Sequence, residues 1–263
     1  MIYKNIDGVP NFRSEEYRDR CSRYAVCIPI INEGERIYLE LARARNVGID
    51  KIVDIIICDG GSEDGSIDST RLNQLGVNTL LTKTDIGKQG AQLRMGFWWA
   101  LKRGYNGIIT IDGNNKDSVE SIPLFIAKLE DGYDFIQGSR FIKGGKAIHT
   151  PFIRHLAVKL IHAPIISITA GKRFTDTTNA FRGYSRKYLE HTEVQPFRDI
   201  FMTYELLAYL SVRATQLDMK TCEVPVTRAY PKNGKTPTKI SFIGGNSNLM
   251  RILINNLFGK YQP

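Results

Sequence analysis

The chain has 263 residues, 42% of them hydrophobic and 24% charged, which is enough to bury a full core as one principal domain. Lysine and arginine number 36 against 27 acidic residues, and the resulting net charge of +9 favours anionic partners such as nucleotides or a phospholipid surface. The sequence has no uninterrupted run of 18 apolar residues, no signal-peptide start and no paired cysteine spacing, so we expect a soluble cytoplasmic protein without a disulfide or zinc framework.

Short apolar runs alternate with helix-length amphipathic segments along the first half of the chain. The runs cover residues 24–30, 53–58, 77–82, 106–111 and 133–137. The segments between most of them cover residues 35–47, 66–75, 91–103 and 118–129. Continuous apolar strands separated by helices predict a mainly parallel sheet covered on both faces. Ligands of such sheets bind beyond the carboxyl ends of the strands, where the polar clusters of this chain fall.

The pattern changes after about residue 138, where helices are expected at 151–169 and 199–214, a turn-rich segment at 171–187 and a strand at 219–226. A loop rich in proline, glycine and lysine then precedes an amphipathic helix. The predicted organisation is an N-terminal arm over 1–22, a principal domain over 23–230, and a C-terminal loop and amphipathic helix over 231–263.

The run that ends at Ile111 is followed directly by Asp112-Gly113-Asn114. A carboxylate at the end of a buried strand, with a second oxygen donor two residues on, can hold a divalent cation against a nucleotide diphosphate. The same three residues are also ordinary turn chemistry. Neighbouring motifs favour the first interpretation, because PIINE (29–33) and CDGGSEDGS (58–66) place acceptors and glycines at the ends of two more strands.

Seven motifs in this order resemble those of family 2 glycosyltransferases of the GT-A fold. PIINE and DGGSEDGS resemble PxxNE and DDGSxDGT, DIGKQGA (85–91) resembles NxGKGxA, and DGN occupies the place of DxD. The segments 138–145, 176–182 and 223–226 are similar to the dolichyl-phosphate mannose synthase-like branch. The resemblance implies a Rossmann-like α/β domain with a mostly parallel sheet and a C-terminal helical, acceptor-side extension. It also implies inverting transfer of a sugar from a GDP- or UDP-sugar with Mg²⁺ or Mn²⁺.

The same resemblance implies roles for individual residues. Those expected to bind the nucleotide are Pro29, Asn32, Glu33, Asp59, Gly61, Lys88 and Asp112. The metal ligands would be Asp112 and Asn114, and the catalytic residues Asp112, Arg140 and Asp176. The acceptor phosphate would be bound by Arg140, Arg154, Arg182 and Lys239. The main departure from the family pattern is Asn114, which offers a neutral amide oxygen where DxD has a carboxylate; Mg²⁺ can work with one protein carboxylate, phosphates and water.

The distribution of charge also indicates that the acceptor is anionic. Basic residues gather in the half of the chain that is expected to form the acceptor-binding side of the protein. A polyprenyl phosphate is already anionic at neutral pH and needs no general base. A sugar hydroxyl would need one, and Asp176 or Glu205 would be the candidates; Asp176 has the alternative interpretation of a turn or helix cap. The basic, amphipathic segment 152–166 is typical of a helix at a membrane interface, although it could instead cover the sheet.

We therefore expect a nucleotide-sugar donor, a polyprenyl phosphate or saccharide acceptor, and peripheral contact with the inner membrane face from the cytoplasm. Nucleic acid is not an expected partner, and a homo-oligomer is left open. Two alternatives stand beside lipid-linked transfer. One is a sugar-to-sugar transferase of surface polysaccharide synthesis, and the other is a non-catalytic protein that binds nucleotide sugars.

Overall fold

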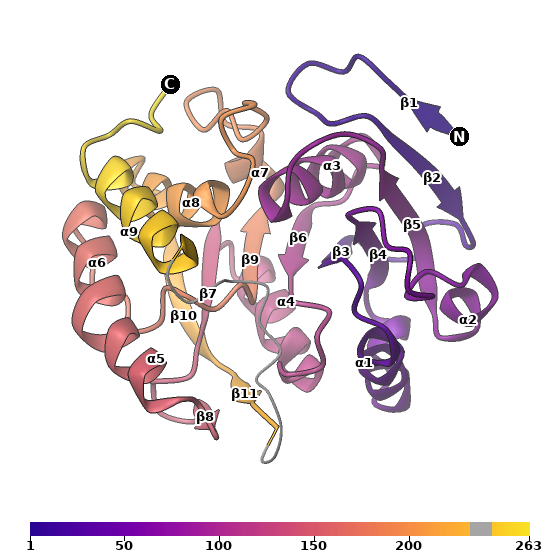
Figure 1. Ribbon diagram of the computed structural model, residues 1–263, viewed down its shortest axis with the longest axis horizontal. Helices are drawn as coiled ribbons and strands as arrows, with labels where there is room; N and C mark the ends of the chain where they lie inside the picture. Colours follow the sequence, from indigo (N-terminus) through magenta and orange to yellow (C-terminus); the bar gives the residue numbers. More distant parts are fainter. Residues whose placement is uncertain (232–243) are drawn as a thin grey trace.

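The structure is a computed structural model that describes residues 1–231 and 244–263. A nine-stranded sheet runs through its centre with the strand order β1-β2-β5-β4-β3-β6-β9-β7-β10 (Figure 1). The strands of this sheet are β1 (Ile2–Tyr3), β2 (Phe12–Glu16), β3 (Tyr24–Ile30), β4 (Asp54–Asp59), β5 (Val77–Lys83), β6 (Gly107–Thr110), β7 (Phe135–Ser139), β9 (Arg182–Ser185) and β10 (Thr221–Pro225). A second, two-stranded sheet pairs β8 (Lys146–Ile148) with β11 (Thr227–Ala229).

Helices cover both faces of the large sheet. They are α1 (Glu35–Asn46), α2 (Ser69–Gln74), α3 (Gln89–Lys102), α4 (Ile122–Glu130), α5 (Phe152–Ala157), α6 (Ala163–Ala170), α7 (Arg186–Leu189), α8 (Glu205–Gln216) and α9 (Gly244–Leu257). Shorter turns are the 3₁₀ segments η1 (Ile49–Lys51) and η2 (Val119–Ser121) and the π-helical η3 (Val158–His162).

The four strands that lead into the first four motifs all point the same way. β3 is parallel to β4 and β6, and β4 is parallel to β5. β9 is antiparallel to both β6 and β7, so β7 and its parallel neighbour β10 also run with β6. The predicted mainly parallel sheet is confirmed, and its strands bring their carboxyl ends to one edge.

Two hydrophobic cores explain why the strands read as continuous apolar runs. Along β3, Ala25 and Cys27 enter the core that also contains α3 and α8, whereas Val26 and Ile28 enter the core beneath α1, α2 and α4. Successive side chains of a strand point to opposite faces, so a sheet buried on both sides has no polar face to alternate with. The expected α/β fold with helices on both faces is confirmed.

The first 22 residues contribute β1 and β2 to the edge of the large sheet. β2 pairs antiparallel with β5, and Phe12 is fully buried. The Phe12 ring stacks on that of Tyr3 at 4.7 Å between centroids, and both rings meet the edge of Trp99 on α3. These aromatic contacts fix the N-terminal segment to α3.

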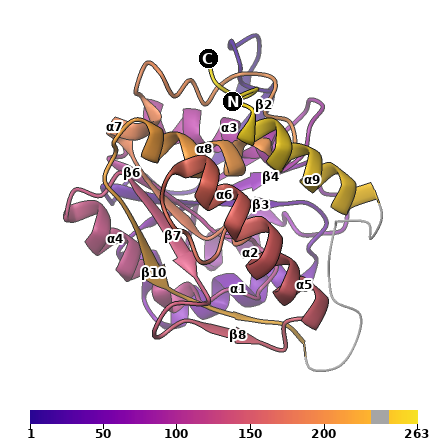
Figure 2. The ribbon, with the colours of Figure 1, turned by 90° about the vertical axis from the view of Figure 1, so that its left-hand side faces the viewer.

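Helices α5, η3 and α6 form one continuous helix from Phe152 to Ala170. Among the described residues it is the one helix long and apolar enough to cross a membrane by length and composition, and only 17% of its most apolar stretch is buried. α6 packs beside α8 and α9 on one side of the molecule (Figure 2). The C-terminal helix expected from the sequence is present as α9, whereas the loop expected at 231–238 lies, after residue 231, outside the described residues.

Candidate active site at the carboxyl ends of the strands

Polar motifs follow four neighbouring strands at the point where each strand ends. Residues 31–34 follow β3, residues 60–66 follow β4, residues 84–88 follow β5, and residues 111–117 follow β6. Because these strands are parallel, all four loops lie at the same edge of the sheet. The sequence motifs are therefore brought together in space.

The loop after β4 is shaped by Asp59, the last residue of that strand. Its carboxylate accepts hydrogen bonds from the backbone N–H groups of Gly61 (2.9 Å) and Ser62 (3.0 Å) and from the Ser62 hydroxyl (2.5 Å). Gly61 has φ +98°, a conformation that a residue with a side chain rarely adopts. Asp59 is fully buried in this arrangement. Its expected contact with a base or ribose stays a prediction.

The first two loops are joined by further hydrogen bonds. The Asn32 amide oxygen accepts from the backbone N–H of Glu63 (2.9 Å), and the Asn32 N–H donates to Ser62 Oγ (2.9 Å). Glu33 pairs with Arg36 on the first turn of α1 at 2.8 Å. Pro29 lies in β3 directly before this loop. The expected nucleotide-binding residues of the first motif thus border the loop that Asp59 organises.

The loop after β5 leads into α3 beside the same edge. Lys88 is exposed, and its backbone N–H donates to the carbonyl oxygen of Met202 (2.8 Å). The next residue, Gln89, donates through Nε2 to Asp112 Oδ1 (3.2 Å). Gln89 occupies the position of the second glycine in the NxGKGxA motif. Its contact with Asp112 was not predicted from the sequence, although this departure from the motif indicated that the residue has a side-chain role.

The Asp112-Gly113-Asn114 segment turns tightly against β3. A Cβ atom on Gly113 would lie 2.5 Å from Ile30 Cγ2, so only glycine fits without moving the strand tip. The side chain of Asp112 is 22% exposed, and Asn114 donates through Nδ2 to Asp112 Oδ2 (3.4 Å). Asn114 Oδ1 is buried and has no hydrogen-bond partner among the described residues. A buried oxygen of this kind usually has a partner, so it is suited to a ligand or an ion.

Asp112 and Asn114 suit a divalent cation that takes most of its ligands from phosphates and water. The described residues contain no group of three or more histidine, cysteine, aspartate or glutamate side chains arranged to hold a metal. Asp112 and Asn114 Oδ1 supply one carboxylate and one neutral oxygen. Mg²⁺ typically binds through one or two carboxylates and completes its shell with phosphates and water, and this donor set agrees with that preference.

Arg228 on β11 lies against the same carboxylate and was not singled out from the sequence. Its guanidinium donates to Asp112 Oδ2 (3.0 Å) and also to Asp117 Oδ2. Burial alone would raise the pKa of Asp112, but the charges of Arg228 and Lys116 outweigh it and hold that pKa below its usual value. Asp112 is therefore ionised, as a metal ligand must be.

Asp117 lies deeper than Asp112. Burial raises its pKa to about 6, although the Arg228 charge opposes the shift. The loop that carries both acids is anchored to α1, because Glu40 accepts from the Asn115 N–H (2.6 Å) and Arg43 donates to the Asn115 side chain (2.8 Å). α1 therefore fixes the position of the acidic loop.

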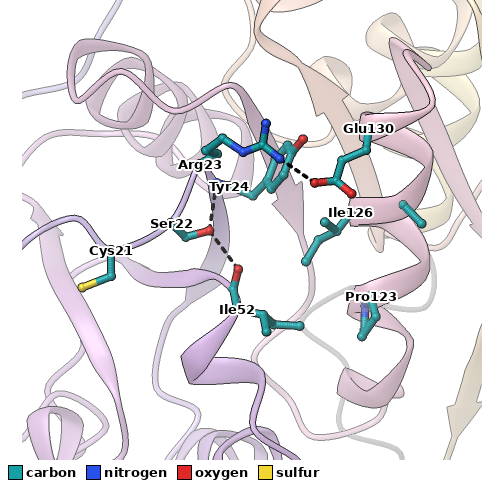
Figure 3. A pocket seen from close by; sticks show the side chains of 9 residues that line it. Cys21, Ser22, Arg23, Tyr24, Ile52, Pro123, Ile126 and Glu130 are labelled. Carbon is teal, nitrogen blue, oxygen red and sulfur yellow. Dashed lines mark hydrogen bonds and ion pairs between the residues drawn. The ribbon is translucent and has the colours of Figure 1, made fainter.

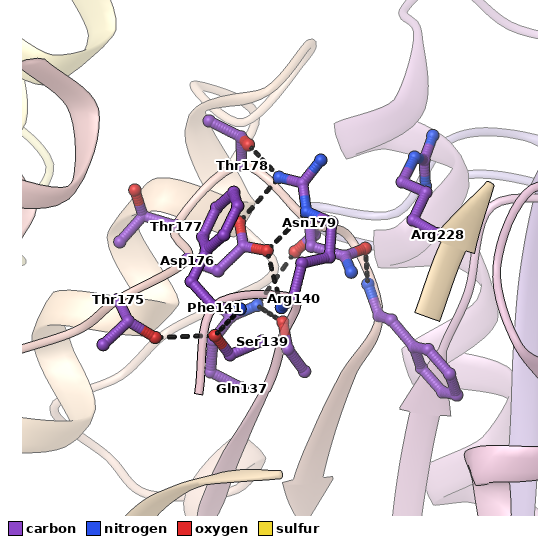
Figure 4. A network of polar contacts seen from close by, with 12 residues as sticks. Gln137, Ser139, Arg140, Phe141, Thr175, Asp176, Thr177, Thr178, Asn179 and Arg228 are labelled. Atoms are coloured by element: carbon purple, nitrogen blue, oxygen red, sulfur yellow. Dashed lines mark hydrogen bonds and ion pairs between the residues drawn. The ribbon is translucent and has the colours of Figure 1, made fainter. Parts of the chain in front are cut away.

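Arg140 and Asp176 form a buried ion pair next to this cluster (Figure 4). Arg140 Nε and Nη2 donate to the two Asp176 oxygens at 2.6 and 2.8 Å, and the Arg140 N–H adds a third hydrogen bond at 3.2 Å. Arg140 Nη2 also donates to Thr178 Oγ1 (2.9 Å). Asp176 is 0% exposed and Arg140 4% exposed. Two of the three expected catalytic residues are thus partners of one another.

Tyr230 lies among three basic side chains. Arg154 on α5 donates to its hydroxyl (3.0 Å), while Lys116 and Arg228 lie over its ring at 5.2 and 5.8 Å from the centroid. Burial would raise the pKa of Tyr230, but the Arg228 and Arg154 charges lower it below its usual value. Arg154, an expected acceptor residue, is thereby joined to the loop of Asp112.

Of the other two expected acceptor residues, Arg182 does not reach this cluster. Arg182 is 2% exposed, and its guanidinium donates to the carbonyl oxygens of Thr177 and Leu207 and to Ser211 Oγ (3.0 Å). The expectation that Arg182 faces the acceptor is corrected, because its donors hold β9 to α8 inside the protein. Lys239 lies outside the described residues.

An open pocket lies at the other edge of the sheet, around the start of β3 (Figure 3). It is lined by residues 21–24, Ile52 and α4, and the Arg23–Glu130 ion pair (2.7 Å) borders it. None of the expected site residues lines it. The carboxyl edge therefore remains the candidate active site.

The chain is similar to curated proteins over most of its length, although no family model matches it. It is 26% identical over 225 residues to undecaprenyl-phosphate mannosyltransferase of Micrococcus luteus, covering 84% of this chain and 90% of that protein. It is 26% identical over 208 residues to polyprenol monophosphomannose synthase of Mycolicibacterium smegmatis, covering 78% and 77%. Dolichol-phosphate mannosyltransferase of Pyrococcus furiosus is 24% identical over 220 residues, covering 82% and 59%.

Solved structures share the fold. Glucosyl-3-phosphoglycerate synthase from Mycobacterium tuberculosis, crystallised with Mn²⁺, UDP and glucosyl-3-phosphoglycerate, superposes with a TM-score of 0.61 at 14% identity, covering 90% of this chain and 78% of that one. The same enzyme with Mg²⁺ and UDP gives a TM-score of 0.64 at 14% identity and the same coverage. The GT-A fold and the resemblance to the polyprenyl-phosphate branch are confirmed.

Proposed function

We propose that this chain is a glycosyltransferase of the GT-A fold that moves a sugar from a nucleotide-sugar donor to a polyprenyl phosphate, with a divalent metal. The observation that carries the proposal is Asp112 at the carboxyl end of β6, beside the unsatisfied oxygen of Asn114. The similarity to polyprenyl-phosphate mannosyltransferases over 78–84% of the chain supports the acceptor class. The base and the sugar of the donor are left open.

The donor lies along the loops after β3, β4 and β6 in this proposal. Pro29, Asn32, Glu33 and the loop held by Asp59 bind the nucleoside, and Lys88 approaches the donor from the start of α3. Asp112 and Asn114 Oδ1 hold Mg²⁺ or Mn²⁺ against the diphosphate. The metal, when bound, supplies positive charge that stabilises the nucleoside diphosphate as it leaves.

The acceptor phosphate enters beside Tyr230. Arg154 and Lys116 attract it, and an oxygen of the phosphate attacks the anomeric carbon on the face opposite the leaving diphosphate, so the configuration inverts. Arginine suits this contact because its planar fork matches phosphate oxygens. Arg140 borders the cluster, and Asp176 positions it rather than acting as a base.

The carboxylates offer little support for a hydroxyl acceptor. Asp176 is pinned between the backbone and the side chain of Arg140. Glu205 is 9% exposed and accepts from the N–H and the hydroxyl of Thr203 at 2.5 and 2.7 Å. A general base must reach the proton of the attacking group, and these two carboxylates are engaged inside the protein. A phosphate nucleophile requires no such base.

The exposed face of α5–α6 provides the route to a lipid. Phe152, Ile153, Leu160 and Ile168 are between 66% and 77% exposed there, and Phe258, directly after α9, is 73% exposed. Soluble proteins rarely leave so many large apolar side chains on one face. We infer that this face lies in the interface of a membrane, with Arg154 and Lys159 at the phosphate level, and that the protein binds the membrane peripherally from the cytoplasm.

The test is transfer of labelled sugar by the purified protein. Each of several radiolabelled GDP- and UDP-sugars is incubated with Mg²⁺ or Mn²⁺ and either polyprenyl phosphate or an oligosaccharide. Label in an organic-extractable product that mild acid releases is the expected result, and it should disappear with Asp112→Ala. Label only in oligosaccharide would overturn the acceptor assignment, and no transfer from any donor would favour a binding protein.

A further inference from the structure

The carboxylate expected to bind the metal already holds a cation of the protein itself. Arg228 Nη2 lies 3.0 Å from Asp112 Oδ2, and the same guanidinium pairs with Asp117. Gln89 Nε2 occupies the other oxygen, Oδ1, at 3.2 Å. Both oxygens of Asp112 are therefore hydrogen-bonded before any metal arrives.

A divalent ion cannot simply add to this arrangement. Mg²⁺ coordinates an oxygen at about 2.0–2.1 Å, so the ion would share a carboxylate with a guanidinium of the same sign. The side chain of Arg228 is 9% exposed and that of Asp112 22%. Both side chains are thus mostly shielded from solvent, and charges repel more strongly where solvent screens them less. Arg228 must loosen its hold on Asp112 when the metal binds.

Arg228 has a second anchor, Asp117, and lies beside the carboxylate that is proposed to hold the metal and the donor diphosphate. Asp117 is buried, and its Oδ1 has no hydrogen-bond partner among the described residues. The Asp117 contact therefore keeps the guanidinium next to the site after it leaves Asp112. A donor diphosphate held at Asp112 offers it new oxygen acceptors, which match the arginine fork.

We propose that Arg228 is an exchangeable counter-ion of the metal site: it occupies Asp112 in the empty enzyme and moves to the donor diphosphate when the metal takes its place. This inference rests on the proposed function, because it needs the metal at Asp112. Metal alone binds weakly, since it must displace Arg228 without compensation. Metal and nucleotide together bind cooperatively, because the diphosphate receives the displaced guanidinium.

The exchange also reaches the acceptor side. Arg228 belongs to β11, which pairs with β8, and its guanidinium lies 5.8 Å from the centre of the Tyr230 ring. Tyr230 accepts from Arg154 at 3.0 Å. Arg228 thus contacts both the metal carboxylate and the cluster around Tyr230 that attracts the acceptor phosphate. Its movement on metal binding therefore couples the two sites.

The test measures Mn²⁺ binding by the electron paramagnetic resonance signal of the free ion, with and without UDP or GDP. Arg228→Gln should bind Mn²⁺ alone about tenfold more tightly than the unaltered protein, and the factor by which nucleotide strengthens Mn²⁺ binding should fall towards one. Arg23→Gln, at the opposite edge of the sheet, is the control for the same loss of charge and should change neither value. Equal or weaker Mn²⁺ binding by Arg228→Gln overturns the proposal.

Two further variants make every outcome informative. If Arg228→Gln does not fold, Arg228→Lys replaces it: an ammonium cannot form the fork to two carboxylates, so the coupling between Mn²⁺ and nucleotide should shrink. Unchanged coupling in Arg228→Lys contradicts the exchange. Asp112→Asn should lose Mn²⁺ binding. If it binds Mn²⁺ as the unaltered protein does, the metal site of the proposed function is wrong, which is a different result from a failure of the exchange.

Discussion

Arg140 and Asp176 form a two-pronged ion pair that is closed off from solvent, with N–O distances of 2.6 and 2.8 Å. The segments that carry them were identified from the sequence as two separate motifs with separate roles. In the structure they are one unit (Figure 4), and it holds Arg140 close enough to Asp117 for the arginine charge to lower the pKa of that carboxyl. The function of either residue depends on the other.

Asp176→Asn should act mainly on stability. It leaves a buried guanidinium without its counter-ion, and breaking a buried pair in this way costs about 3–5 kcal/mol. The free energy of unfolding is measured in urea, and the pH profile of kcat is measured on the folded fraction. We expect a large loss of stability and a profile of unchanged shape. Asp54→Asn, a buried carboxylate far from the site, is the control for stability loss. If Asp176→Asn instead has normal stability, and its kcat no longer decreases at acidic pH, Asp176 acts as a base.

Asn114→Asp should tighten metal binding. The change puts a carboxylate in place of a buried amide oxygen that has no partner in the described part of the chain, and divalent ions prefer charged oxygen ligands. Mn²⁺ affinity in the presence of UDP or GDP should rise roughly fivefold or more, a typical size for such couplings. Asn115→Asp adds the same charge one residue on, at a side chain bonded to Arg43, and should have less effect. Weaker Mn²⁺ binding by Asn114→Asp would show that Asn114 does not face the metal.

Arg154→Gln should weaken acceptor binding and leave donor binding unchanged. Arg154 reaches the Tyr230 hydroxyl from the apolar helix, on the side where we propose that the lipid phosphate arrives. Loss of one hydrogen bond to a charged group corresponds to about 1.5–3 kcal/mol, or about ten- to a hundredfold in KM for polyprenyl phosphate. Initial rates with each substrate varied in turn provide the measurement. A rise in KM for the nucleotide sugar instead would place Arg154 on the donor side.

A double substitution, Phe152→Ser with Ile153→Ser, should reduce membrane binding. Both side chains are at least 70% exposed, so their removal should hardly change the free energy of unfolding. Each contributes about 1.5–3 kcal/mol when buried in lipid, so flotation with anionic vesicles should decrease at least about tenfold. Leu39→Ser, an exposed apolar residue on α1, serves as the matched control. If the double variant floats with the vesicles as well as the unaltered protein does, this face does not contact lipid.

Asp117 should make the protein less stable as pH rises. Its folded pKa of about 6 lies above the ordinary aspartate value of 3.8, so the folded state binds the proton more tightly than the unfolded chain does. Stability from this group is therefore present near pH 4 and is lost as pH rises through about 6, by about 3 kcal/mol in total. In Asp117→Asn this loss should disappear. Urea unfolding of both proteins at several pH values is the measurement, and parallel curves would contradict the assignment.

Local patterns were sufficient for the sheet and for the position of the site. The apolar runs correspond to β3–β7 because a strand buried on both faces must be apolar throughout, and that is visible in a few consecutive residues. The carboxyl ends of parallel strands meet at one edge, so Asp59 and Asp112 could be placed there without coordinates. Less regular elements were missed. β9 is four residues long and lies in a segment that reads as turns, and β2 carries exposed charges because it lies near the edge of the sheet.

By itself the sequence determined the fold class, the order of the motifs and the carboxylate at the end of β6, because each depends on neighbouring residues. Only the tertiary structure decided which charges meet. Arg228 pairs with Asp112 across 116 residues of chain, Arg140 pairs with Asp176 across 36, and Arg182 is turned inward to hold α8. Charge and spacing in a sequence do not specify such pairs. They arise where segments far apart in the chain meet at the carboxyl edge of the large sheet, and burial makes the loss of either partner costly because it leaves the other charge unpaired.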